Sequence, residues 1–122
     1  MRRVAEDPER EQRITDEIVV DAYGPEEQAL GWYYHLESRL RFPFGAKCIR
    51  VRPTSPLRKK EEATVVRMAP EDDCMSDMLV IIEWCGRTLG VPLAQLEGVD
   101  VDEETAQAIA DWHYWVARGY QF

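Results

Sequence analysis

The stretch DMLVIIEW, residues 77–84, is the strongest strand signal in the sequence. Its apolar and β-branched side chains form a nearly continuous run of strand length, and such a run is typical of a strand buried on both faces. We therefore expect it in a central position of a sheet. Cys85-Gly86-Arg87 follows as a tight turn, and a short strand is predicted over 88–91.

Two further strands are predicted before this stretch. Residues 63–68 contain three successive β-branched side chains, and residues 47–52 alternate with a period of two, which places Ile49 and Val51 on the same face. The acidic cluster at 70–73 is expected to form a turn, and residues 92–96 a short helical turn.

Helical patterns lie on both sides of the strands. Asp7-Pro8 is a start signal for a first helix, which is expected to run to Ala22. Pro25 opens a second helix, which ends before Phe42-Pro43. A third is expected from about Glu103, with Asp102 as its N-cap, ending at Gly119. Its first turn is acidic, as the helix dipole favours.

The order of these elements predicts an α+β fold. Two N-terminal helices precede several short strands, and one C-terminal helix follows them. Strands this short are typical of a small SH3-like barrel or a strongly bent antiparallel sheet. A length of 122 residues favours one domain over 1–122, with 1–10 as a loosely ordered tail.

Composition indicates a cytoplasmic protein with no membrane segment. The longest apolar run is strand-sized, far short of the ~18 residues that span a bilayer. The N-terminus is charged and contains no signal-peptide core. The three cysteines are scattered and odd in number, which argues against a disulfide framework. They also form no zinc-type pair with each other or with the two histidines.

Charge is unevenly distributed along the chain. Of the net charge of −8, residues 1–60 contribute +2 and residues 61–122 contribute −10. The second half is therefore expected to attract cations or basic partners and to repel nucleic acid. Residues 39–60 contain eight basic and no acidic side chains. They form either a surface for a partner or nucleic acid, or ion pairs with the acidic half.

The segment EDDCMSD, residues 71–77, is the most acidic loop. Four carboxylates occur within seven residues, and Ca²⁺ takes six to eight oxygen ligands from carboxylates, carbonyls and water. The predicted ligands in this loop are Glu71, Asp72, Asp73 and Asp77. A solvated turn is the alternative, because aspartate also stabilises turns through its own backbone.

Other acidic positions are weaker candidates. Asp100 to Asp111 matches an EF-hand loop only in part, because position six is Thr105 instead of glycine. Glu37 lies near the C-terminal end of the second helix, where a carboxylate opposes the dipole and a cation would compensate it. Glu17 and Asp21 form a like-charge pair at i, i+4. No nucleophile motif or phosphate loop is present in the sequence, so no enzyme is predicted.

Several short motifs taken together resemble the CcbP-type family of small cyanobacterial calcium-binding proteins. These motifs cover most of residues 10–122, and their combination is more specific than any one of them. They are EIVVDAY at 17–23, GWYY at 31–34, Leu36-Glu37, FPF at 42–44, AKC at 46–48, SPL at 55–57, Met68-Ala69, Asp73-Cys74, VPL at 91–93 and DWHYW at 111–115.

The resemblance implies non-EF-hand binding of Ca²⁺ through surface carboxylates, with a role as a calcium buffer or signalling protein. It also implies a pair of acidic residues after Leu36, where this chain has Glu37-Ser38. The predicted ligand set is therefore Glu37, Glu71, Asp72, Asp73 and Asp77. The alternative hypothesis is an acidic protein–protein interaction module that needs no metal. A protein partner is compatible with either function.

Overall fold

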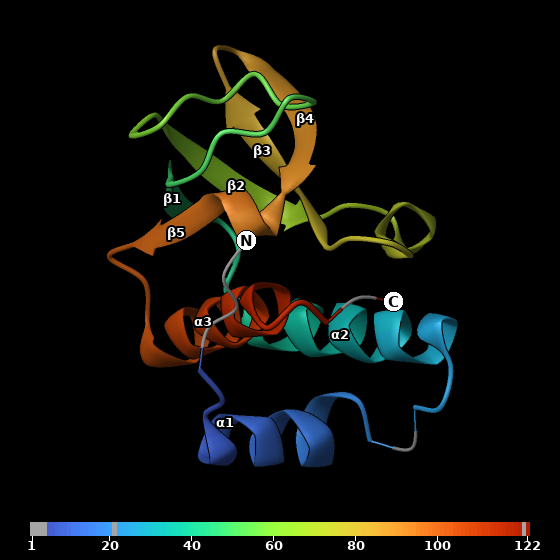
Figure 1. Ribbon diagram of the computed structural model, residues 1–122. Helices are drawn as coiled ribbons and strands as arrows, with labels where there is room; N and C mark the ends of the chain where they lie inside the picture. The colour runs from blue at the N-terminus through green and yellow to red at the C-terminus, as the bar shows by residue number, and fades with distance from the viewer. Residues whose placement is uncertain (1–4, 21, 121) are drawn as a thin grey trace.

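The computed structural model describes residues 5–20, 22–120 and 122. It contains three α-helices, and the strands fall between the second and the third (Figure 1). In chain order the elements are α1 (Pro8–Arg13), the π-helical turn η1 (Ile14–Ile18), α2 (Pro25–Arg39), β1 (Phe44–Cys48), β2 (Glu62–Met68), the 3₁₀ turn η2 (Glu71–Cys74), β3 (Leu79–Trp84), β4 (Arg87–Pro92), the 3₁₀ turn η3 (Leu93–Gln95), β5 (Leu96–Val99) and α3 (Glu103–Ala117).

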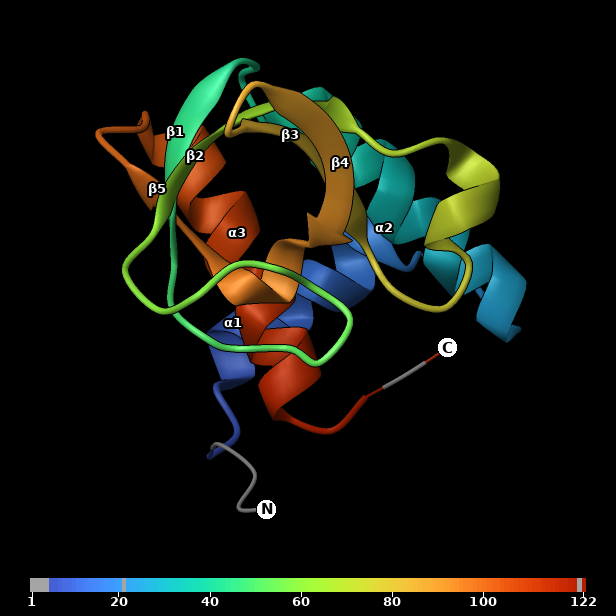
Figure 2. The same cartoon turned by 90° about the horizontal axis from the view of Figure 1, so that it is seen from above.

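The five strands form one antiparallel sheet in the order β4-β3-β2-β1-β5. β3 pairs on both edges, which confirms the interior position expected for residues 77–84. In the part of the chain that the structure describes, β4 and β5 do not pair, so the sheet stays open. Its strong curvature is visible from above (Figure 2). The fold is therefore α+β with a bent antiparallel sheet, one of the two predicted forms.

One strand prediction was wrong, and one strand was missed. The strand expected over 47–52 lies earlier, at Phe44–Cys48, where Phe44, Ala46 and Cys48 point into the core. Residues beyond Cys48 leave the sheet as a loop with prolines at 53 and 56, and proline cannot donate to a strand ladder. β5 was not predicted, because four residues with one glycine carry too weak a pattern.

The first helix is shorter and less regular than expected. The N-cap prediction is confirmed, because the backbone N–H of Arg10 donates to Asp7 Oδ1 at 3.2 Å. The α-helix ends at Arg13, however, and a π-helical turn replaces the rest. This turn packs very closely on α2: a Cβ at Gly31 would lie 2.4 Å from the carbonyl oxygen of Ile18. Only glycine permits that approach.

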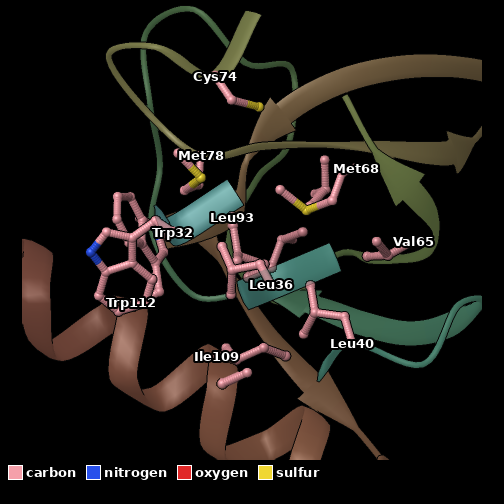
Figure 3. Packing of buried hydrophobic residues seen from close by; sticks show 14 of the residues in the cluster. Trp32, Leu36, Leu40, Val65, Met68, Cys74, Met78, Leu93, Ile109 and Trp112 are labelled. Atoms are coloured by element: carbon pink, nitrogen blue, oxygen red, sulfur yellow. The ribbon is translucent and has the colours of Figure 1, made fainter. Parts of the chain in front are cut away.

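The core lies between the concave side of the sheet and the helices α2 and α3 (Figure 3). Trp32 and Leu36 of α2 are fully buried there and face Trp112 of α3. The rings of Trp32 and Trp112 meet edge-on with centroids 5.0 Å apart, which is a favourable aromatic geometry. No helix of the described residues is long and apolar enough to cross a membrane.

Polar contacts attach α1 to α3. The guanidinium of Arg13 binds both oxygens of Asp111, at 2.7 and 3.2 Å, and Asp111 is almost fully buried. The hydroxyl of Tyr114 accepts from the backbone N–H of Asp7 and donates to Glu11 Oε2. α1 itself buries no residue, so these contacts and the two isoleucines of η1 hold the N-terminal segment in place.

Both histidines are partly buried in the helical layer. His35 on α2 meets the edge of Trp32, and His113 on α3 donates its Nε2–H to the carbonyl of Leu96 at 2.6 Å. Burial lowers the pKa of each imidazole below its ordinary value near 6.5, and Arg39 and Arg50 respectively add to the effect.

We expect these histidines to make the protein less stable in mild acid. A histidine whose pKa is lower in the folded state contributes stability fully above the unfolded pKa, and this contribution is lost as the pH falls below about 6.5. Urea unfolding at pH 7 and pH 5 should therefore show a lower free energy of unfolding at pH 5. The double variant His35→Gln, His113→Gln should reduce this difference, and an unchanged difference would contradict the assignment.

Candidate metal site

The acidic loop, residues 71–77, lies beside α2 between the end of β2 and the start of β3 (Figures 1 and 2). Buried side chains anchor it from below: Cys74 and Met78 are fully buried, and the Cys74 thiol contacts the carbonyl of Leu79. The hydroxyl of Tyr33 donates to the carbonyl of Ala69 at 2.9 Å, which ties the loop's entry to α2. The apolar anchors leave the carboxylates at the surface.

Glu37 and Glu71 both act electrostatically on a pair of tyrosines, Tyr33 and Tyr34. The hydroxyl of Tyr34 donates to Glu71 Oε2 at 2.7 Å, and this bond together with the charges of Glu71 and Glu37 raises the pKa of Tyr34. Burial raises the pKa of Tyr33, and the charges of Glu37 and Glu71 raise it further. Both carboxylates therefore act on the same two hydroxyls, although they belong to different elements.

Asp73 and Asp77 act electrostatically on the buried Cys74. Burial is the main cause of the raised pKa of the Cys74 thiol, and both aspartates add to it. Asp77 is half-buried, and its burial raises the pKa of its own carboxyl, which the charge of Arg52 opposes. Asp72 is exposed at the tip. Burial disfavours the charged form of Asp77, and a bound cation would stabilise that charge.

The five predicted ligands do not form one preassembled cluster. Within residues 5–20, 22–120 and 122, no three His, Cys, Asp or Glu side chains lie close enough together to hold a metal ion. Glu37 and Glu71 share an electrostatic effect on Tyr33 and Tyr34, Asp73 and Asp77 share one on the Cys74 thiol, and Asp72 is exposed. Like charges repel when no cation separates them, so an acidic loop of this kind is expected to spread its carboxylates until one binds.

The weaker acidic candidates have structural roles. Asp102 caps α3, since its Oδ1 accepts from the N–H of Thr105 at 3.3 Å, as predicted. Its pKa is lowered by the bonds to Thr105 and by Arg41. Glu17 pairs weakly with Arg39, at 3.8 Å. Asp21, the other member of the predicted like-charge pair, lies outside the described residues.

A polar cavity that the sequence did not predict lies between η1, α2 and α3. Its volume is about 250 Å³, and the charged side chains that line it come from both ends of the chain: Arg13, Glu17, Arg39, Glu104 and Asp111. Each of these carboxylates lies within 4.0 Å of an arginine nitrogen. The two arginines and three carboxylates leave the cavity a net charge of only −1, so it is less suited to a cation than the acidic loop.

Comparison with known proteins also points to calcium binding. The family model Calci_bind_CcbP, described as calcium binding, matches residues 12–116. The crystal structure of Anabaena CcbP is 43% identical to this chain, covers 100% of both chains and superposes with a TM-score of 0.88. A calcium binding protein in the calcium-binding form is 46% identical, also over 100% of both chains, with a TM-score of 0.84. No curated protein sequence matches the chain.

Proposed function

Because the chain belongs to the CcbP family of calcium-binding proteins, we propose that it binds Ca²⁺ at the acidic loop together with Glu37. The observation that supports this assignment is that Glu37 and Glu71 both act electrostatically on Tyr33 and Tyr34, and that Tyr34 also donates a hydrogen bond to Glu71. A carboxylate of α2 therefore lies within electrostatic range of a loop that contains four. This arrangement differs from an EF-hand, in which one twelve-residue loop supplies the ligands.

The loop offers oxygen ligands of the kind that Ca²⁺ prefers. Glu71 accepts the Tyr34 hydroxyl on Oε2 and has Oε1 left for a cation. Asp72 and Asp73 are exposed and can turn inward at little cost, and the loop's carbonyls and water complete a coordination of six to eight. Binding would also offset the repulsion among the carboxylates, which supports a site that assembles around the ion.

Ser38 limits the number of ligands near Glu37. Its hydroxyl donates to the carbonyl of His35 at 2.9 Å inside α2, so this position supplies a short neutral side chain where the resemblance implies an acid. Affinity follows the number of charged ligands and the rigidity of the site. We therefore expect weaker binding, or fewer ions bound, than with two acids at 37 and 38.

We also propose that the protein acts as a cytoplasmic calcium buffer or signalling protein. The family's function is binding, which supports the prediction that the chain is not an enzyme. An acidic interaction module that needs no metal is the competing function. The two differ in one respect that can be measured directly, which is whether the protein takes up Ca²⁺ from solution.

The test is calorimetric titration of chelator-treated protein with Ca²⁺, with Mg²⁺ as the competing ion. We expect saturable binding with a preference for Ca²⁺, because Mg²⁺ demands near-ideal octahedral geometry that dispersed surface carboxylates do not provide. The double variant Asp72→Ala, Asp73→Ala should bind at least about tenfold more weakly. Glu62→Ala, Glu83→Ala removes two exposed carboxylates from the sheet and serves as the matched control.

The outcomes separate the site from the function. Unchanged affinity in Asp72→Ala, Asp73→Ala would move the site away from the acidic loop while leaving calcium binding intact. Equal weakening by the control pair would reduce the effect to general surface charge. Absence of Ca²⁺ binding by the unaltered chain up to millimolar concentration would contradict the proposed function and favour the metal-independent module.

A further inference from the structure

A strongly basic segment stands out on an otherwise acidic protein. The basic loop, residues 47–60, starts with the last two residues of β1 and leads towards β2. It contains six Lys or Arg residues and no acidic residue. With a net charge of −8 for the whole chain, the remaining residues carry −14. The segment crosses the face of the molecule seen from above (Figure 2). Its charge is therefore opposite in sign to that of its surroundings.

The basic loop forms no close ion pairs with acidic side chains of the described residues. The two arginines that come before this loop in the sequence do pair with acidic residues. Arg39 lies 3.8 Å from both Glu17 and Glu104, and Arg41 lies 3.3 Å from Asp102. In contrast, no basic side chain of residues 47–60 lies within 4.0 Å of a carboxylate of the described residues. Among the described residues this segment therefore forms no close ion pair, and its electrostatic link to the acidic half is the action of Arg52 on Asp77.

The backbone of the basic loop is held in place. The side chain of the fully buried Gln95 donates to the carbonyl of Arg50 at 2.9 Å, and the N–H of Ile49 donates to the carbonyl of Gln95 at 2.7 Å. Leu57 is fully buried and anchors the middle of the loop. A preorganised loop loses little conformational entropy on binding, so its unpaired charges are suited to recognition.

An apolar cavity of about 380 Å³ lies next to the start of the basic loop, between β5 and α3. Its walls are mostly apolar, with Ile49, Val101 and Ile109 among them; His113 and a single carboxylate, Glu97, are the polar side chains of the lining. Arg50 directly follows Ile49, and its charge acts on His113, so the basic loop and this cavity are neighbours. Val51, in the basic loop itself, is 63% exposed.

We propose that the basic loop and this cavity form a docking surface for an acidic segment of a partner protein, with an apolar side chain of the partner entering the cavity. Charge complementarity selects an acidic ligand, and the cavity requires an apolar group that the backbone of a nucleic acid does not offer. A long polyanion would also run onto the acidic remainder of the surface and be repelled there. This function is additional to calcium binding and does not depend on it.

The probe is a fluorescein-labelled peptide in which one phenylalanine is flanked by glutamates, measured by fluorescence anisotropy at low salt with chelator present. We expect saturable binding that weakens as salt is added. The variant Arg58→Gln, Lys59→Gln should weaken it about five- to tenfold. Arg67→Gln, Arg87→Gln removes two exposed charges outside the loop and should leave it within about twofold.

The cavity is tested separately from the charge. Ala106→Leu extends a side chain into this cavity, and Gln107→Leu places the same side chain on the next position of α3, which lines the polar cavity instead. We expect weaker peptide binding for Ala106→Leu alone, and a similar loss when alanine replaces the phenylalanine of the peptide. Far-ultraviolet circular dichroism confirms that both leucine variants are folded.

Three results would overturn the proposal. Absence of peptide binding at low salt excludes the docking surface. Equal losses of peptide affinity in the two charge variants would show that the basic loop is not part of the binding surface. Equal losses in the two leucine variants would show the same for the cavity. Tighter binding of a labelled single-stranded DNA oligonucleotide, abolished by Arg58→Gln, Lys59→Gln, would assign the surface to nucleic acid instead of protein.

Discussion

Replacing Asp111 by alanine should lower the free energy of unfolding by about 3 kcal/mol, because it removes the buried half of the ion pair that joins α1 to α3. The Asp111 side chain is 2% exposed and binds Arg13 through both oxygens, with Arg10 at 3.5 Å as a second partner. The hydrogen bond to Asp111 is the main cause of the raised pKa of Arg13. Urea unfolding followed by circular dichroism measures the loss.

An exposed ion pair provides the comparison. Arg41→Gln breaks the contact with Asp102 at 3.3 Å, but the Arg41 side chain is 78% exposed, so its loss should cost no more than about 1 kcal/mol. Similar losses in the two variants would mean that burial of Asp111 does not strengthen its pairing, and would contradict the role assigned to it.

Truncation of Trp32 to alanine should cost about 3–5 kcal/mol, the range for a large buried aromatic side chain. Trp32 is fully buried in α2 and contacts two tryptophans of α3, with ring centroids 5.0 Å from Trp112 and 5.5 Å from Trp115. The alanine variant would leave a cavity between the two helices that the rigid rings around it cannot fill. Thermal and urea unfolding both report the change.

Two substitutions sharpen this expectation. Trp32→Phe keeps most of the volume and should cost less than Trp32→Ala. Trp84→Ala truncates the same residue type at the end of β3, where the side chain is only partly buried, and should also cost less. A loss for Trp84→Ala as large as that for Trp32→Ala would contradict the central place of Trp32 in the core.

The elements that the sequence predicted well are those with a complete local signal. Residues 77–84 are a continuous apolar run, and α3 has both a capping aspartate and an acidic first turn. β1 and β5 have no such signal: FGAKC and LEGV contain glycines and few β-branched residues. Their strand conformation comes from pairing with neighbouring strands, which a local pattern does not contain.

For the candidate site, too, the sequence predicted the features with a local signal and missed the contacts made only by folding. The acidic loop was identified from its own composition, whereas Glu37 was selected through its place on a helix end and a family resemblance. The link between the acidic loop and α2 arises only in the folded chain, as the hydrogen bond between Tyr34 and Glu71 shows, because these residues are 37 positions apart in the sequence. The polar cavity depends on an even longer separation, the 98 positions between Arg13 and Asp111. No periodicity predicts such meetings.

The way in which α1 is attached has a consequence for the protein's motions. α1 buries no side chain, and it is joined to α3 by part-buried charge-assisted and tyrosine hydrogen bonds. Segments with few buried apolar contacts open at a lower free energy than the whole domain unfolds. α1 is therefore expected to unfold locally, as a unit separate from the rest of the domain. Its detachment would expose the Arg13 side of the polar cavity while the sheet, α2 and α3 keep their packing.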